Sequence, residues 1–106
     1  MQESLFKTAT ATEECGKTHR YSYWLITTQI PAGQISFEEY GVRITAADGE
    51  SACLPSLTHS YSRIGSLLAL LAEHTVSPSH LYDVAADWAK ENHLPQPMLQ
   101  QVADMV

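Results

Sequence analysis

The chain has 106 residues, of which 44% are hydrophobic and 17% charged, so it is long enough and apolar enough for one domain with its own core. Twelve acidic residues outweigh six basic ones, and the formal net charge of −6 argues against binding to nucleic-acid phosphates. Cys15 and Cys53 fit no zinc-site pattern, and no apolar run reaches the roughly 20 residues that span a bilayer. We therefore expect a cytoplasmic protein with two reduced thiols and no membrane contact.

The first 18 residues are polar and rich in threonine, glutamate and alanine. They contain no apolar segment of the kind that marks a secretory signal. We interpret residues 1–18 as a flexible polar leader and residues 19–106 as a single small domain.

The first predicted strand covers residues 20–30, RYSYWLITTQI, where β-branched and aromatic residues are dense. Trp24 and Ile26 fall on one face and Tyr23 on the other, which is typical of a central strand. The PAGQ segment at residues 31–34 predicts a turn, because proline presets φ and glycine accepts a positive φ.

A second strand is predicted over residues 35–47, but its apolar positions change phase. Ile35 and Phe37 set one phase and Val42 the opposite one. One extra residue at 38–41 would restore a single buried face, so we expect a β-bulge there.

The Asp48–Gly49 pair is the strongest hairpin signal in the chain. It predicts a third strand over residues 50–57, ESACLPSL. Pro55 cannot donate a ladder hydrogen bond, which indicates an edge strand or the end of a strand.

After Ser60 the apolar period changes from two to 3.6, which predicts a helix over about residues 61–74. Its apolar stripe consists of Ile64, Leu67, Leu68 and Leu71. Leu70 lies about 110° from the centre of that stripe, so the apolar face is wider than one packing contact needs.

Residues 76–92, VSPSHLYDVAADWAKEN, predict a second helix that begins near Pro78. We also expect a short third helix whose inward residues are Met98, Leu99, Val102 and Met105. Three strands followed by helices predict an α+β fold, with an antiparallel three- to four-stranded sheet and two or three helices packed on one face. The predicted core comprises Trp24, Ile26, Phe37, Val42, Ile44, Leu54, Ile64, Leu67, Leu68, Leu71, Leu81, Val84 and Trp88.

Little in the sequence points to chemistry. His80, Asp83 and Asp87 lie on the helix face opposite Trp88, where charged neighbours are the usual pattern of a solvated surface. The five histidines have none of the spacings of a metal site, and no glycine-rich phosphate loop is present. We therefore predict no catalytic residue, no metal and no cofactor.

Two short motifs carry a family resemblance. The segment from Tyr40 to Ile44 fits Y-G-[IV]-x-[IV], and the segment from Ser77 to Val84 fits S-P-x-H-L-x-D-V. With the helix between them, they resemble a family of small bacterial proteins, found largely in Clostridia and other Firmicutes, that is known only as a domain of unknown function. The resemblance covers roughly residues 21–90 and implies a cytoplasmic protein of a Gram-positive bacterium, without an assigned activity.

The first hypothesis for function is a non-enzymatic protein-interaction or regulatory module. Leu57, Leu70 and Tyr82, or alternatively the open edge of the sheet, are its predicted contact surface, because the 61–74 helix has more apolar surface than one packing contact needs. The partner is an unidentified protein or a second copy in a homodimer.

The alternative hypothesis is a small-molecule-binding or enzymatic domain. It would use His80 and Asp83 together with Tyr40, and it requires a pocket where these groups meet. Neither hypothesis involves a nucleic acid or a membrane.

Overall fold

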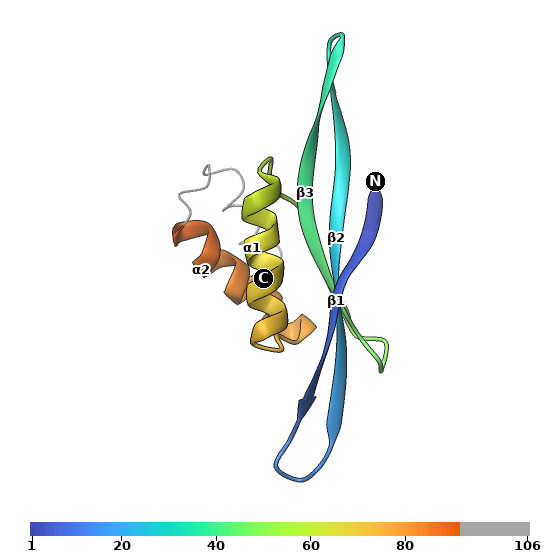
Figure 1. Ribbon diagram of the computed structural model, residues 1–106, viewed down its shortest axis with the longest axis vertical. Coiled ribbons are helices and arrows are strands. Elements are labelled where there is room, and N and C mark those ends of the chain that lie inside the picture. Colours follow the sequence, from blue (N-terminus) through green and yellow to red (C-terminus); the bar gives the residue numbers. More distant parts are fainter. Residues whose placement is uncertain (92–106) are drawn as a thin grey trace.

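The sheet consists of four consecutive strands that pair as antiparallel neighbours (Figure 1). The structure, a computed structural model, describes residues 1–91 of the chain. The strands are β1 (Gln2–Thr12), β2 (Thr18–Ala32), β3 (Ile35–Ala46) and β4 (Ser51–Thr58), and they stand in that order across the sheet. Because each strand pairs with the next one along the chain, the connections are short hairpins.

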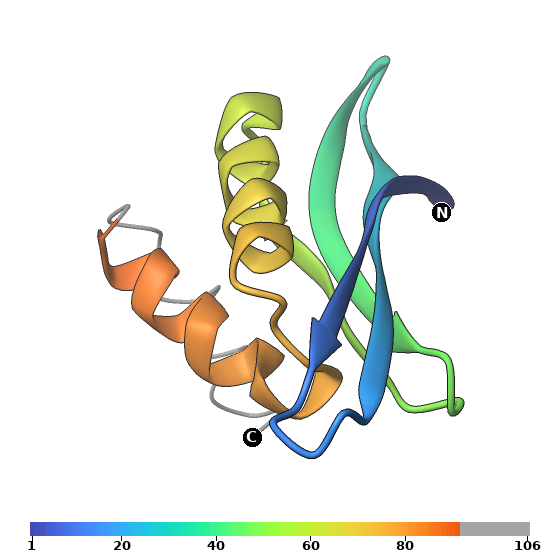
Figure 2. The same cartoon turned by 60° about the horizontal axis from the view of Figure 1, so that its bottom comes forward.

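The helices follow the strands and cover one face of the sheet (Figure 2). They are α1 (Tyr61–Glu73) and α2 (Leu81–Glu91), with a single 3-10 turn, η1 (Pro78–His80), before α2. The Ser60 hydroxyl accepts a hydrogen bond from the backbone N–H of Arg63 and so caps α1. The predicted α+β class is confirmed. The third predicted helix lies outside the described residues.

Residues that we interpreted as a flexible leader form β1, so that prediction is wrong. β1 pairs with β2 from Gln2 opposite Thr27 to Thr12 opposite Thr18. As an edge strand it is mostly exposed on both faces, and it needs few apolar side chains to stay in the sheet. Its polar composition therefore hid it, and the folded domain includes β1.

Both predicted turns are confirmed. Gly33 and Gln34 form a two-residue link between β2 and β3, and Gly49 lies in the link between β3 and β4. Gly33 has a φ of +69° and Gly49 a φ of +98°, a region that side chains disfavour. Glycine at these two positions lets the chain reverse without strain.

The predicted bulge lies in the neighbouring strand. β3 pairs with β2 in one unbroken register, whereas its pairing with β4 shifts between Tyr40, opposite Thr58, and Val42, opposite Leu54. The extra residues are therefore in β4, and the prediction of a bulge in β3 is wrong. Gly41 makes room for them, because a Cβ there would collide with the Leu54 carbonyl oxygen and the Pro55 backbone.

Since β3 has no bulge, its phase change is real and its first apolar residues face away from the helices. Ile35 is 72% exposed and Phe37 is 43% exposed, so the prediction that Phe37 belongs to the core is wrong. The alternation of side chains along each strand divides the sheet into a helix-facing side and an opposite side, which we call the open face. The open face carries Glu3, Leu5, Trp24, Ile26, Arg43, Thr45, Ser51 and Cys53.

The core packs the helix-facing side of the sheet against α1 and α2. The following predicted core residues are buried there: Val42, Ile44, Leu54, Ile64, Leu67, Leu68, Leu71, Leu81 and Trp88. Ile26 is buried as well, but on the open face. Trp24 and Val84 are half-buried. Tyr23 joins the core as well, and its hydroxyl donates a buried hydrogen bond of 2.9 Å to the carbonyl oxygen of Val76. This bond ties β2 to the segment between the helices.

Candidate functional site

The predicted interaction residues are distributed unevenly between core and surface. Leu57 is fully buried, so its assignment to a contact surface is wrong. The irregularity in β4 resets the alternation, and Leu54 and Leu57 both point inward although they are three residues apart. Leu70 and Tyr82 are half-buried and pack against the core. Their contact with a partner stays a prediction.

The structure does not bring together the residues of the predicted ligand site. His80 is exposed, and its Nδ1 lies 2.7 Å from the hydroxyl of Ser77, in the turn that precedes α2. Asp83 is exposed in the first turn of α2. Tyr40 is buried and donates a hydrogen bond of 2.5 Å to a carboxylate oxygen of Glu38. No hydrogen bond connects any two of the three predicted residues in the part of the chain that the structure describes.

A cavity of about 560 Å³ lies between the β1–β2 hairpin, the β3–β4 turn and the segment before α2. Ser77 and Ser79 beside His80 line it, but His80, Asp83 and Tyr40 do not. Lys17 and Arg20 line it together with Glu13, Asp48 and Glu50. Charges of both signs therefore surround the cavity. The charges that line the cavity therefore give it no clear preference for an anionic or a cationic ligand.

The cavity contains a histidine paired with a carboxylate. His19 Nε2 lies 2.9 Å from Glu13 Oε1, and the imidazole stacks on Tyr21 with ring centroids 6.2 Å apart. The hydrogen bond with His19, followed by one from the Cys15 thiol, holds the pKa of Glu13 below its ordinary value. Such a pair can orient an imidazole for proton transfer, but both side chains remain open to water.

The sequence interpretation missed this pair because it assigned Glu13 to the leader. A predicted hairpin in this segment would have indicated the pair. Thr12 pairs with Thr18, which brings residues 13 and 19 close together across the turn.

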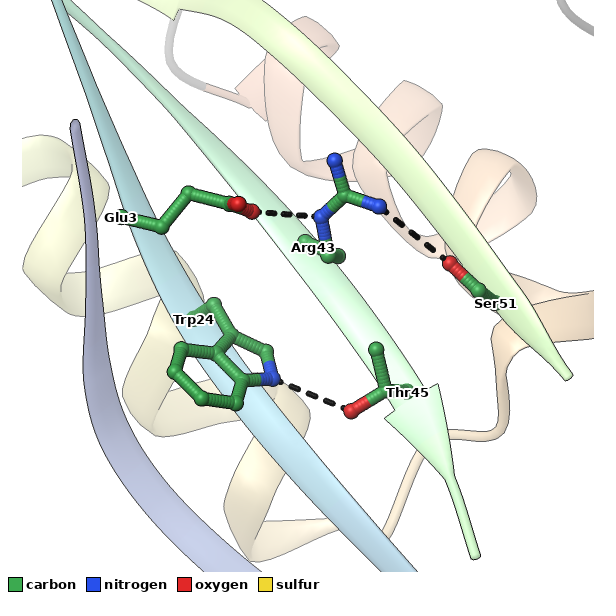
Figure 3. Close-up of polar contacts among 5 residues, drawn as sticks. All are labelled: Glu3, Trp24, Arg43, Thr45 and Ser51. Atoms are coloured by element: carbon green, nitrogen blue, oxygen red, sulfur yellow. Dashed lines mark hydrogen bonds and ion pairs between the residues drawn. The ribbon is translucent and has the colours of Figure 1, made fainter. Parts of the chain in front are cut away.

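The centre of the open face is a polar cluster that connects several strands (Figure 3). The Arg43 guanidinium on β3 donates to the carboxylate of Glu3 on β1 and, at 3.5 Å, to the hydroxyl of Ser51 on β4. The Trp24 indole N–H donates to the Thr45 hydroxyl at 3.0 Å. Hydrogen bonding with Glu3 raises the pKa of Arg43 further. The cluster thus links β1, β3 and β4 through Arg43, and β2 to β3 through Trp24.

Cys53 is opposite Arg43 on the same face and is half-buried. Burial raises the pKa of its thiol, and this effect is larger than the opposing effect of the Arg43 charge. The thiol is therefore protonated at neutral pH, unlike the thiolate that a cysteine nucleophile requires.

Exposed apolar side chains flank the polar cluster at two places. Leu5 and Phe6 on β1 are 54% and 45% exposed. Ile35 and Phe37 lie at the start of β3, near the β2–β3 turn, and are 72% and 43% exposed. Large apolar residues exposed in groups are a feature of contact surfaces, whereas scattered single ones are ordinary.

The second of these places is a projecting hairpin. Residues 29–38, which we call the arm, extend past the helices at the end of the molecule (Figure 1). Every residue from 31 to 38 is exposed. At the base of the arm, His59 packs edge-on against Phe37 with ring centroids 5.1 Å apart, and its Nδ1 lies 3.3 Å from the Glu38 carbonyl oxygen. The arm is thus anchored at its base and free of helix contacts at its tip.

Within residues 1–91 no group of three or more His, Cys, Asp or Glu side chains is arranged to hold a metal ion. Neither α1 nor α2, the helices of the described region, is long and apolar enough to cross a membrane. A model of a protein family of unknown function, DUF6514, matches residues 2–91. Comparison with curated proteins and with solved structures gives no match.

Proposed function

The chain belongs to the DUF6514 family of unknown function, and on the strength of its own surface we propose that it is a non-enzymatic protein-interaction module whose arm inserts into a groove on a partner protein. We further propose that it acts in the cytoplasm, because Cys15 and Cys53 are free thiols. The observation that carries the proposal is the exposed apolar pair on the arm, Ile35 and Phe37.

The apolar surface of the arm is costly to leave in water. Burial of apolar surface contributes about 25 cal/mol per Å² of favourable free energy, so large exposed apolar side chains are the usual anchors of an interface. Ile35 and Phe37 alternate along β3 and so point to the same face of the arm, and the cross-strand neighbour of Phe37 is the half-buried Ile30. These three side chains therefore share one face of the arm.

The arm is also ordered before it binds. Two strands in register support it, and His59 holds its base through Phe37 and the Glu38 carbonyl group. A preordered element loses less conformational entropy on association than a loop does, which favours affinity.

The charge of the arm indicates which partner surface would complement it. Residues 21–42 contain Glu38 and Glu39 but no lysine or arginine. An arm with apolar side chains and only acidic charges complements an apolar groove with a basic rim. We therefore expect a partner with lysine or arginine beside its groove.

Site-specific photo-crosslinking tests the proposal. A photoreactive residue at Gln34, at the arm tip, should crosslink to a specific protein in host lysate, and the same probe at Glu73, exposed at the end of α1, should not. With the crosslinked protein purified, Phe37→Ser should weaken binding by at least about tenfold, as loss of an aromatic anchor does. Gln34→Ser is the matched control, since it changes an exposed polar residue of the same arm and should leave affinity unchanged.

Crosslinking with equal yield from positions 34 and 73, or equal affinity of the wild type and Phe37→Ser, would contradict the proposal. A thermal melt of Phe37→Ser separates loss of binding from loss of fold.

A further inference from the structure

We propose that β1 pairs edge to edge with β1 of a second copy, through residues 8–12, and joins two four-stranded sheets into one. This surface is separate from the arm, and the inference does not depend on the function proposed for the arm.

The hydrogen-bond pattern shows which backbone groups are free at this edge. The N–H of Glu13 donates to the Lys17 carbonyl oxygen at 2.8 Å, so residues 13 and 17 form a hydrogen-bonded pair of the β1–β2 ladder. Pairs alternate along an antiparallel ladder, and therefore the backbone N–H and C=O of Thr8, Thr10 and Thr12 point away from β2. Arg20, the residue opposite Thr10, supports this assignment. Its carbonyl oxygen accepts a hydrogen bond from the N–H of Ala47, just after β3, so its backbone groups point toward β3 and away from Thr10.

These outward groups belong to a palindromic segment. Residues 8–12 read Thr-Ala-Thr-Ala-Thr in both directions. Two antiparallel copies centred on Thr10 place each threonine opposite a threonine and each alanine opposite an alanine. Both copies then present the same residues to the same face of the sheet, as a two-fold symmetric interface requires. Three hydrogen-bonded pairs would form about six backbone hydrogen bonds.

Along residues 8–12, β1 has none of the features that usually prevent edge-to-edge pairing. Exposed edges are usually guarded by charges, prolines or bulges. In β1 the register shift between Leu5 and Lys7, the Lys7 charge and the Glu13 charge all lie outside residues 8–12. The opposite edge strand, β4, contains Pro55 and the irregularity beside it. Within the described part of the chain no strand pairs with the outer edge of β1.

The occupant that fits is a second copy of this chain. A segment of alternating threonine and alanine offers no large side chain and no charge that could select another sequence. Its palindrome, in contrast, makes it complementary to itself in a single register.

Sedimentation equilibrium of the purified full chain, with Thr10→Pro beside it, tests the dimer. The wild type should approach twice the monomer mass of 11.7 kDa as concentration rises. Because the Thr10 N–H makes no bond within the chain, proline there leaves the β1–β2 ladder intact, and the dissociation constant should rise by at least about tenfold. Thr10→Val, which keeps the N–H and the strand preference, should dimerise like the wild type. A wild type that stays monomeric at millimolar concentration, or a folded Thr10→Pro variant that dimerises normally, would overturn the proposal.

Disulfide trapping tests the register. In a Cys15→Ser background, Thr10→Cys should oxidise readily to a covalent dimer, since directly paired residues are about 5.5 Å apart between Cα atoms. Thr8→Cys should oxidise at least about tenfold more slowly, because the two Thr8 residues would be displaced by four positions, or about 14 Å. Equal rates would rule out this register. Phe37→Ser should dimerise like the wild type, so failure of the edge and failure of the arm are distinguishable.

Discussion

Replacement of Tyr23 by phenylalanine removes one atom from the junction between the sheet and the helical layer. The Tyr23 hydroxyl is the donor to the Val76 carbonyl oxygen, at 2.9 Å, and the Tyr23 side chain is fully buried. Without the donor, that carbonyl group loses its side-chain partner, and a buried acceptor left in this way costs about 1–3 kcal/mol. At pH 7 we therefore expect the free energy of unfolding of Tyr23→Phe to be about 1–3 kcal/mol lower than that of the wild type.

The pH dependence of this difference is a sharper test. Burial raises the pKa of Tyr23 from 10.0 to about 12. Below pH 10 the phenol is protonated in the folded and the unfolded chain, so its contribution is constant. Above pH 10 the unfolded chain loses this proton first, and the free energy of unfolding falls as pH rises towards 12. At pH 11 the wild type should have lost about 1.4 kcal/mol that Tyr23→Phe, having no phenol at this position, does not lose.

Urea denaturation of both proteins at pH 7, 9 and 11 measures these values. Titration of tyrosines and lysines distant from Tyr23 is common to the two proteins and cancels in the difference. The expected gap is constant from pH 7 to 9 and narrows, or reverses, at pH 11. A gap that stays constant up to pH 11 would show that Tyr23 ionises equally easily in both states, and the argument from burial would fail.

Two further predictions concern Gly41 and the two cysteines. Gly41→Ala should lower the free energy of unfolding by about 1–3 kcal/mol or more, because its methyl group would meet the β4 backbone rather than a flexible side chain. Gly65→Ala is the control, since a Cβ there meets open space within α1 and should raise stability by about 0.5–1 kcal/mol; chemical denaturation that ranks the two alike would contradict the packing at Gly41. At pH 8 a thiol reagent should label exposed Cys15 at least about ten times faster than half-buried Cys53, whose pKa is raised by burial. Mass spectrometry of the labelled peptides measures both rates, and faster labelling of Cys53 in the folded protein would be the contrary result.

The elements that the sequence predicted correctly are those whose side chains alone determine the pattern. The 3.6-residue stripe on α1 and the glycine of each hairpin turn are local signals, and each led to the right element. β1 was missed because an edge strand owes its structure to the hydrogen bonds of β2 rather than to apolar alternation. A polar strand of this kind has no periodic signal to read.

The surface residues were harder to predict because their exposure depends on pairing. Phe37 lies in a strand with apolar residues in both phases of its alternation, and only the register and the length of the arm leave it exposed. Leu57 is buried because β4 is irregular beside Pro55, which no alternating pattern specifies. The exposed face of the arm and the outward N–H groups of β1 are both consequences of tertiary pairing, so single-sequence periodicity could identify neither.

The two proposed surfaces make one geometric consequence unavoidable. A two-fold axis between paired antiparallel strands runs perpendicular to the sheet, so the helices of both copies lie on the same side and the open faces form one surface on the other. The same rotation turns one copy by half a revolution within the sheet plane, and the two arms then point in opposite directions. In the proposed dimer each arm would reach its own groove, so the dimer would present two anchors rather than one. A dimer binds a partner that has repeated grooves with higher apparent affinity than a single arm does, because its two sites are linked. Loss of the edge contact therefore removes this increase in apparent affinity, while the affinity of a single arm persists. Loss of the arm anchor removes binding of the partner but leaves the dimer intact, so the two surfaces are independently testable.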